Sequence, residues 1–284
     1  MGWPDIAVRK VTLITGGSRG IGEGCARVFV QAGAPVVICA RGREAGETLA
    51  AELAAKGPGT CHFEPCDVTQ PDDIRRVIER TVELHGRLDC LINNAGWHPD
   101  HRPIDGFSVQ DLNDLLQLNV VSYFAGCKYA LPYLRQTRGS IINMSSLVGD
   151  VGQEWAVTYV ATKGAITAMT KALAVDEARN GVRVNAVLPG VISTPLHRSF
   201  VESQEDPQRA EALVNSWQWM ERIGTAEEVG YACLFLASDF ASFITGIALP
   251  VSGGAELAYG IKVSNENATA RDKPSAVYPR EPRG

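Results

Sequence analysis

Tyr159 and Lys163 are the two residues whose types and spacing first suggest chemistry. They enclose the run Tyr-Val-Ala-Thr-Lys, and residues four apart lie on one face of a helix, which places the ammonium beside the phenol. A tyrosine with an ordinary pKa of about 10 is a poor base at neutral pH. A nearby lysine and a positively charged ligand would favour the phenolate and let Tyr159 act as a general acid/base. The same spacing is common on ordinary amphipathic helices, so the pair needs support from other residues.

Ser145 and Ser146 follow the apolar run Ile-Ile-Asn-Met that precedes this helix in the chain. The run is typical of a buried strand, and ligands of open α/β sheets bind at the carboxyl ends of the strands. A serine hydroxyl at that edge can donate a hydrogen bond to a substrate oxygen and stabilise its developing negative charge. The alternative is that the serines cap the following segment, which explains one of them better than both.

Residues 15–22, Thr-Gly-Gly-Ser-Arg-Gly-Ile-Gly, connect the first expected strand to the first expected helix. Gly16, Gly20 and Gly22 allow a tight turn, close approach of the backbone to a pyrophosphate and close packing of helix on strand. The N-terminus of the helix adds unpaired N–H groups and a positive dipole. In this strand–turn–helix context the glycines predict a dinucleotide-binding site. A plain strand-to-helix turn is the alternative.

The end of the second expected strand indicates which dinucleotide binds. An acidic residue usually holds the ribose 2′-hydroxyl there, but this chain has Ala40 followed by Arg41. Arg41, together with Arg19 of the glycine loop, could bind a 2′-phosphate through charge-assisted hydrogen bonds. NADP(H) is therefore favoured over NAD(H), unless Arg41 is only a solvated loop charge. Asp67, at the end of the third strand, is expected to meet the adenine.

The elements that position these residues alternate along the chain. Short, uniformly apolar runs alternate with segments of helical period, as expected for a parallel sheet covered by helices on both faces. We predict a single doubly wound Rossmann-type α/β domain with a seven-stranded parallel sheet. The expected strands are 8–15, 35–40, 60–66, 88–93, 139–144, 182–188 and 247–251. The expected helices are 20–32, 43–56, 71–85, 108–135, 156–180 and 226–237.

The expected domain covers residues 1–261. Within it, residues 193–222 form a long insertion beyond a strand end, which is often a substrate lid. Residues 262–284 are charged, contain proline and have few large apolar side chains, which predicts a disordered C-terminal tail.

Composition limits the remaining possibilities. The 284 residues carry a net charge of −5, which argues against a nucleic-acid partner. No apolar run approaches the length of a membrane span, and no secretory signal is expected at the N-terminus. The seven cysteines are odd in number and dispersed, so we expect reduced thiols that serve as small core residues of a cytoplasmic protein.

In order and spacing, these motifs resemble those of the short-chain dehydrogenase/reductase family over residues 8–255. The resemblance rests on the glycine loop and on Asn93–Gly96, Asn119, Ser146, Tyr159, Lys163, Pro189, Gly190 and Thr194. It implies that Tyr159 is the general acid/base, that Lys163 lowers its pKa and holds the nicotinamide ribose, and that Ser146 orients the substrate oxygen. It further implies that Asn119 holds a water of a proton relay.

The resemblance also implies a set of cofactor-binding residues that runs along the strand ends. Thr194 would bind the carboxamide and Ile192 would contact the nicotinamide. The full set is Gly16, Ser18, Arg19, Gly20, Ile21, Gly22, Arg41, Asp67, Val68, Asn93, Ala95, Gly96, Tyr159, Lys163, Pro189, Gly190, Ile192 and Thr194.

Within the family, residues 146–153, 159–173 and 253–260 resemble a group of 17β-hydroxysteroid dehydrogenases. This likeness implies a cytosolic homotetramer that oxidises a secondary alcohol, with a 17β-hydroxysteroid such as estradiol as substrate. L-fucose dehydrogenase activity is attributed to the same group, so oxidation of a sugar hemiacetal to a lactone is the alternative, and NAD(H) is the alternative cofactor. The implied substrate residues are Ser146, Gln153, Tyr159, Trp97, Leu196 and Tyr259.

Three positions depart from that group. It has an acidic residue where Ala40 stands, a histidine where Trp97 stands and a tryptophan where His197 stands. The first departure leaves the choice of NAD open, and the other two leave the substrate open.

Other functions fit the sequence less well. His98 and His101 lack further ligands at suitable spacing, so no metal is expected, and the pair is expected at the mouth of the pocket. The nucleophile motif of esterases is missing around Ser146. A cofactor-sensing protein without activity would usually have lost the tyrosine or the lysine, and both are present.

Overall fold

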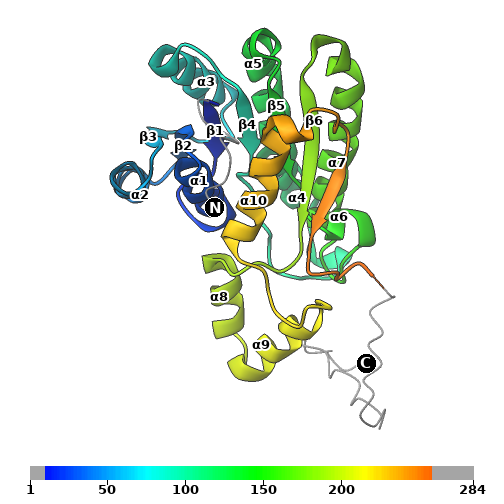
Figure 1. Ribbon diagram of the computed structural model, residues 1–284. Coiled ribbons are helices and arrows are strands. Elements are labelled where there is room, and N and C mark those ends of the chain that lie inside the picture. Colours follow the sequence, from blue (N-terminus) through cyan, green and yellow to red (C-terminus); the bar gives the residue numbers. More distant parts are fainter. Residues whose placement is uncertain (1–9, 258–284) are drawn as a thin grey trace.

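The structure is a computed structural model that describes residues 10–257 (Figure 1). Its strands form one parallel sheet in the order β3-β2-β1-β4-β5-β6-β7, so the predicted seven-stranded doubly wound fold is confirmed. The chain order reverses between β1 and β4, where doubly wound sheets bind their ligands. The strands are β1 (Thr12–Thr15), β2 (Pro35–Ala40), β3 (Thr60–Pro65), β4 (Cys90–Asn93), β5 (Ser140–Met144), β6 (Arg183–Pro189) and β7 (Ala248–Val251).

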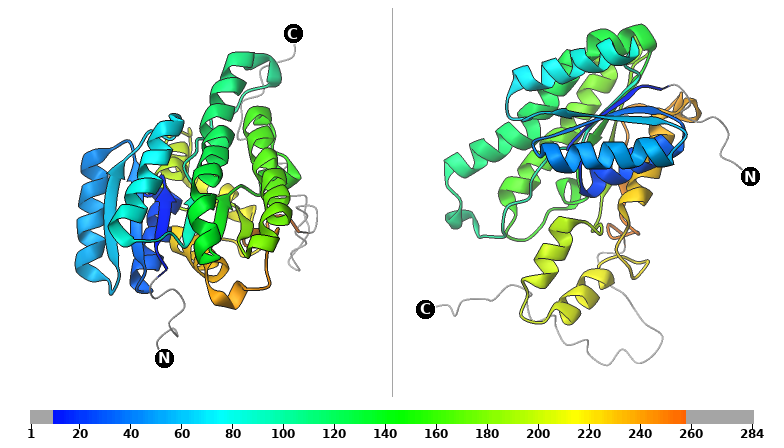
Figure 2. Two further views of the ribbon diagram at one scale, coloured as in Figure 1. Left: turned by 90° about the horizontal axis from the view of Figure 1, so that it is seen from above. Right: turned by 90° about the vertical axis from the view of Figure 1, so that its left-hand side faces the viewer.

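Helices cover both faces of the sheet, as the right-hand view of Figure 2 shows. The layer of α1 (Gly20–Gln31), α2 (Arg43–Lys56) and α10 (Ala226–Ala237) encloses one buried apolar cluster, which includes Phe29 and Leu236. The layer of α3 (Pro71–His85), α5 (Ser122–Thr137) and α7 (Val157–Glu177) encloses the other, which includes Ile78 and Leu134. Because both faces are buried, the strands are apolar without alternation.

The crossing of α1 and α10 depends on a glycine. A Cβ at Gly24 would lie 2.4 Å from the carbonyl carbon of Ala226 and 2.5 Å from its oxygen. Only a residue without a side chain lets the two backbones approach this closely. The crossing fixes α1, and with it the glycine loop that precedes α1.

The predicted helix 108–135 is interrupted. α4 (Val109–Leu116) begins at a capping box formed by Ser108 and Asp111, and a π-helix (Gln117–Val121) separates it from α5. This π-helix carries Asn119, whose buried side chain bonds to two neighbouring elements. No glycine or proline marks the wider turn, so the pattern of apolar residues did not reveal it.

The insertion 193–222 contains two short helices, α8 (Pro195–Glu202) and α9 (Pro207–Ser216). Each has a proline in its first turn and a side-chain cap, from Thr194 and Asp206 respectively. They lie apart from the two helical layers (Figure 1), and Thr194 lies close to Gly20 of the glycine loop. Their role as a lid stays a prediction. The predicted tail lies outside the described residues.

The shorter helices complete the path of the chain: α6 (Val148–Val151) and the 3₁₀ helices Ile104–Gly106, Ala178–Asn180 and Asp239–Ala241. All seven cysteines are buried thiols, which confirms their expected place in the core. Among residues 10–257, no helix has the length and apolar character needed to cross a membrane.

Candidate active site

Ser146, Tyr159 and Lys163 meet beyond the carboxyl end of β5. The serine follows β5, and the other two lie on the first turns of α7, which packs beside that strand end. The side chains of Ser146 and Tyr159 form a hydrogen bond. Lys163 is buried, and its Nζ donates to the main-chain oxygen of Met144 at 2.8 Å. The structure therefore brings together a phenol, a hydroxyl and an ammonium, as the sequence led us to expect.

The electrostatics of this trio differ from the expectation. Burial raises the pKa of Tyr159 to about 12, and the hydrogen bond with Ser146 opposes this rise. Burial also lowers the pKa of Lys163 to about 7. The Nζ atom lies 5.6 Å from the centroid of the tyrosine ring. The side chains alone thus leave Tyr159 protonated at neutral pH, and the expected fall in its pKa requires a further positive charge.

The side chain of Asn119 hydrogen-bonds both to the loop after β4 and to α7. Its Oδ1 accepts from the backbone N–H of Trp97 at 2.9 Å, and its Nδ2 donates to the Trp97 carbonyl at 3.0 Å. The Nδ2 also donates to Thr162 Oγ1 at 3.1 Å. The residue next in sequence to Thr162 is Lys163, so Asn119 links the loop that holds Trp97 to the helical turn that carries the lysine. Sequence reasoning did not identify Thr162.

The glycine loop has the shape that a pyrophosphate requires. Gly16 and Gly20 have positive φ angles of 64° and 58°. A Cβ at Gly22 would lie 2.3 Å from the Gly16 carbonyl oxygen, and one at Gly16 would lie 2.9 Å from the Cα of Ala95. The loop therefore curls tightly against the start of α1 and the end of β4. Among the described residues, the Arg19 side chain does not cap α1, which leaves the helix N-terminus open to an anion.

Asn94 and Thr15 hold this loop in place, and sequence reasoning placed both within motifs without giving either a role. The Asn94 Nδ2 donates to the carbonyl oxygens of Thr15 at 2.9 Å and Gly16 at 3.2 Å. The Thr15 Oγ1 accepts from the backbone N–H groups of Asn94 at 2.9 Å and Ala95 at 3.1 Å. The signal that could have found Asn94 is its position next to Asn93 at the end of a buried strand, where polar side chains need partners.

Asp67 lies at the expected end of β3, but its carboxylate serves the local backbone. Its Oδ1 accepts from the N–H of Thr69 at 3.0 Å and from the Thr69 hydroxyl at 2.8 Å. These hydrogen bonds, and more weakly the charge of Arg41, hold the pKa of Asp67 below its usual value. Arg41 is exposed. No hydrogen bond or ion pair ties its guanidinium to another of the described residues.

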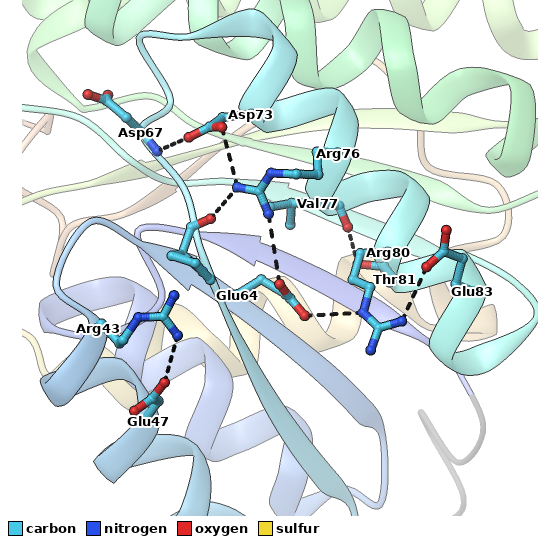
Figure 3. A network of polar contacts seen from close by, with 11 residues as sticks. Arg43, Glu47, Glu64, Asp67, Asp73, Arg76, Val77, Arg80, Thr81 and Glu83 are labelled. Carbon is cyan, nitrogen blue, oxygen red and sulfur yellow. Dashed lines mark hydrogen bonds and ion pairs between the residues drawn. The ribbon is translucent and has the colours of Figure 1, made fainter.

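The carboxylates that surround Asp67 are already paired (Figure 3). Asp73 accepts from the Asp67 N–H at 2.9 Å and pairs with Arg76 at 3.3 Å. Glu64 lies between Arg76 and Arg80, at 3.9 and 3.4 Å. Asp73 and Glu64, the carboxylates near Asp67, therefore already pair with Arg76 and Arg80.

The expected nicotinamide end lies after β6. Gly190 donates to the Val251 carbonyl at 3.0 Å, and a Cβ at Gly190 would lie 2.9 Å from the Cα of Ser252. Ile192 is buried and forms a bridge with Gly224. The hydroxyl of Thr194 caps α8 by accepting from the N–H of His197 at 3.2 Å. These contacts bring the segment after Pro189 to the same edge of the sheet as the glycine loop.

Polar side chains gather on the open side of Tyr159. The His98 ring lies over the tyrosine ring, with 4.1 Å between centroids, and its Nε2 is 3.1 Å from Gln153 Oε1. The His101 ring lies tilted by 43° against the His98 ring, with 4.8 Å between centroids. Burial, followed by the neighbouring His98, lowers the pKa of His101 to about 4. Of the predicted substrate residues, Gln153 is thus beside Tyr159, whereas sequence reasoning had placed His98 only at the pocket mouth.

Trp97 and Leu196 present large apolar side chains to the solvent, 46% and 45% exposed. Tyr259 lies outside the described residues. Within residues 10–257, no group of three or more metal-ligating side chains occurs.

Comparisons with known proteins agree with this architecture. The family described as Enoyl-(Acyl carrier protein) reductase matches residues 16–256. The chain is 49% identical to an L-fucose dehydrogenase of Bos taurus over 253 residues, which are 89% of this chain and 92% of the relative. It is 48% identical to an L-fucose dehydrogenase of Mus musculus over 258 residues, which are 91% and 92% of the two chains.

Solved structures show the same likeness. The ligand-free aldohexose dehydrogenase of Thermoplasma acidophilum superposes with a TM-score of 0.81 at 34% identity, covering 90% of this chain and 98% of that one. A short-chain type dehydrogenase/reductase from Mycobacterium ulcerans gives a TM-score of 0.83 at 31% identity, covering 89% and 92%. With its parallel sheet, its glycine loop and its Ser–Tyr–Lys cluster, the chain belongs to the short-chain dehydrogenase/reductase family, whose members are oxidoreductases that act on CH–OH groups with NAD(P)(H).

Proposed function

We propose that this protein oxidises the hemiacetal carbon of L-fucose or a similar sugar to the lactone. The observation that carries the proposal is the hydrogen-bonded His98–Gln153 pair, whose His98 ring lies tilted against the Tyr159 ring with 4.1 Å between centroids. A sugar requires several convergent hydrogen-bonding groups, whereas a steroid requires an apolar slot. The two L-fucose dehydrogenases at 48–49% identity support the same substrate class. The 17β-hydroxysteroid that we expected first finds no support among these relatives.

In the proposed mechanism, Tyr159 takes the proton of the anomeric hydroxyl while the hydrogen on the same carbon leaves as hydride. A nicotinamide cofactor held at the glycine loop would supply the hydride acceptor and a positive charge near the phenol. Ser146 donates a hydrogen bond to the reacting oxygen and stabilises its alkoxide character. Lys163 favours the phenolate through its positive charge and would hold the nicotinamide ribose of a bound cofactor. Asn119 holds the loop of Trp97 against α7 and contributes to the proton path.

We assign the cofactor to the edge formed by the glycine loop, Asp67, Val68, the segment Asn93–Gly96 and the segment after Pro189. The positive φ angles and the absence of room for a Cβ in the loop fit a pyrophosphate. Arg41 and Arg19 are both exposed, and they favour NADP(H), since a 2′-phosphate would give Arg41 a direct ion pair, which none of the described carboxylates forms with it.

The test of the substrate is kcat/KM for L-fucose and for estradiol, each with NAD⁺ and NADP⁺. We expect turnover of L-fucose and little or none of estradiol. Tyr159→Phe should abolish turnover and leave cofactor binding nearly intact. A higher kcat/KM for estradiol would refute the sugar assignment, and full activity of Tyr159→Phe would refute the mechanism.

The test of the cofactor is the double substitution Ala40→Asp, Arg41→Ser. It introduces the carboxylate that a ribose 2′-hydroxyl requires and removes the guanidinium. We expect the ratio of kcat/KM for NADP⁺ to that for NAD⁺ to fall by at least tenfold, since one charge-assisted pair contributes about 1.5–3 kcal/mol. Arg43→Ser is the matched control, because Arg43 already pairs with Glu47 at 2.9 Å. A wild-type enzyme that strongly prefers NAD⁺ would refute the role of Arg41.

We further propose a homotetramer in the cytoplasm. Exposed apolar side chains support it: Phe124 on α5 and Val175 on α7, and Phe235 on α10 and Phe240 just after it. If α5–α7 and the α10 region each paired with their own copy around a twofold axis, a tetramer would result. Light scattering coupled to size-exclusion chromatography tests this proposal, and a monomer at working concentrations would refute it.

A further inference from the structure

The main-chain oxygen of Met144 accepts two side-chain hydrogen bonds at the end of β5. Lys163 Nζ donates to it at 2.8 Å, and the Tyr123 hydroxyl donates to it at 3.2 Å. Lys163 is 4% exposed and Tyr123 is 1% exposed, so neither donor exchanges this partner for bulk water. A carbonyl oxygen has two lone pairs, and in this site the two donors use both.

Tyr123 also faces the ammonium with its ring. The distance from Lys163 Nζ to the ring centroid is 5.8 Å on the Tyr123 side and 5.6 Å on the Tyr159 side. An ammonium within about 6 Å of a ring centroid is attracted by the π face. The lysine therefore lies between a tyrosine of α5 and a tyrosine of its own helix.

The other groups around this pair do not supply a negative charge. Burial is the one cause that shifts the pKa of Lys163, and no carboxylate opposes it. Burial, with Tyr159 and Cys127 nearby, raises the pKa of Tyr123 well above its usual value, so its phenol stays protonated and acts as a hydrogen-bond donor. The charge of Lys163 thus depends on the Met144 carbonyl and on the two rings.

We propose that Tyr123 is a positioning residue for Lys163, one that sets how strongly the ammonium is held through a shared carbonyl and an aromatic face. This inference rests on the proposed role of Lys163 in the reaction. The two parts of Tyr123 act in opposite directions. Its hydroxyl competes with the lysine for the carbonyl and weakens the ammonium form, whereas its ring stabilises that form.

Two substitutions separate these effects. Tyr123→Phe removes the competing donor and keeps the ring, so the Lys163–Met144 hydrogen bond strengthens and the lysine titrates at higher pH. Tyr123→Leu removes the ring as well, so the buried ammonium loses its π contact and titrates at lower pH. Each shift should be on the order of half a pH unit, since both contacts contribute about 1 kcal/mol.

The primary readout does not depend on turnover. The Kd of NADPH is measured as a function of pH, from the fluorescence of NADPH, in wild type, Tyr123→Phe, Tyr123→Leu and Lys163→Met. The part of the pH dependence that is lost in Lys163→Met belongs to the lysine, and its midpoint is the pH at which the lysine titrates. The expected result is a midpoint that moves up in Tyr123→Phe and down in Tyr123→Leu. A midpoint that stays in place or moves down in Tyr123→Phe would overturn the proposal.

Tyr129→Phe is the matched control, because Tyr129 lies on the same helix and its ring faces the exposed residue Lys128, whose Nζ is 6.0 Å from the ring centroid. This variant should leave the midpoint unchanged. Tyr123→Phe decides the question alone if Tyr123→Leu does not fold. The acid limb of kcat/KM gives a second measurement. It should lie at lower pH in Tyr123→Phe, because the ammonium form of Lys163 is more stable in this variant and favours the Tyr159 phenolate. If no sugar is turned over, the proposed function fails, while the binding curves still test Tyr123.

Discussion

Ser146→Ala should affect the reaction in two separable ways. The Ser146 side chain is 8% exposed, and its hydrogen bond lowers the pKa of Tyr159 against the effect of burial. A hydrogen bond to an ionised group contributes about 1.5–3 kcal/mol, and about 1.36 kcal/mol corresponds to one pKa unit. Without the serine, the acid limb of kcat/KM, which reports the free enzyme, should therefore move to higher pH by about one to two units.

The second effect is the loss of the donor to the reacting oxygen. Removing one such donor typically lowers kcat by about 10²–10³-fold. At pH values above the acid limb Tyr159 is ionised in both enzymes, so the plateau of kcat reports this second effect alone. The assay measures kcat and kcat/KM for L-fucose oxidation across the whole pH profile, with cofactor reduction followed by absorbance.

Ser145→Ala is the control for Ser146→Ala. The Ser145 hydroxyl donates to the Lys163 carbonyl at 2.8 Å and lies 3.0 Å from Thr167 Oγ1, so it fastens α7 to β5. Its loss should lower the free energy of unfolding by about 1–3 kcal/mol and leave the acid limb in place. A plateau of Ser146→Ala within about tenfold of wild type, or an acid limb that does not move, would refute the reasoning.

Three further predictions concern stability and cofactor binding. Gly24→Ala forces a methyl group against the Ala226 backbone, so the free energy of unfolding, measured by thermal unfolding, should fall by about 1–3 kcal/mol. An unchanged Tm would contradict the close crossing of α1 and α10. Glu177→Gln breaks the pair with Arg135, which holds the pKa of Glu177 below its usual value. That pair stabilises the fold above the unfolded-state pKa and is lost as pH falls through the folded-state value. In urea, the free energy of unfolding of the variant should be about 1–2 kcal/mol lower than that of the wild type at neutral pH, and this difference should become smaller in acid. A difference that becomes larger in acid would contradict the prediction. Asn94→Ala releases two glycine-loop carbonyls, so the Kd of the cofactor should rise about tenfold, as fluorescence titration would show; an unchanged Kd would mean that the loop holds its own shape.

The sheet was predictable because burial on both faces leaves a simple trace in the sequence. The expected strands 35–40 and 60–66 coincide with β2 and β3 to within one residue. β1 begins at Thr12, later than expected: Val11 is buried and apolar, and its carbonyl accepts from the Cys90 N–H at 3.0 Å, but the paired strand residues start at Thr12. Apolar residues report burial, and burial extends beyond the hydrogen-bonded strand.

The candidate site was predictable in its reacting side chains and not in the residues that support them. Tyr159 and Lys163 stand out through their helical spacing. Asn94, Thr162 and Tyr123 act through backbone carbonyls and hydroxyls of segments far away in the sequence. Such contacts exist only after the fold has formed, so spacing along the chain contains no trace of them.

The pKa shifts of Tyr159 and Lys163 could not be predicted from the sequence for the same reason. A lysine four residues from a tyrosine suggests a lowered phenol pKa, but the same burial that brings the two together raises the pKa of Tyr159 and lowers that of Lys163. Which effect is larger depends on solvent exclusion, and this is a property of the packed site.

The π-helix at Gln117–Val121 has a consequence for how this chain is compared with its relatives. A π turn contains one residue more than the α turn it replaces, so it behaves as a local insertion that the helix absorbs without a loop. A relative with one residue fewer in this stretch would still form a helix, but every side chain before the gap would turn by about 100° relative to those after it. A one-residue gap in an alignment at this point therefore carries functional information. It separates chains that can direct an asparagine at both Trp97 and Thr162 from chains that cannot.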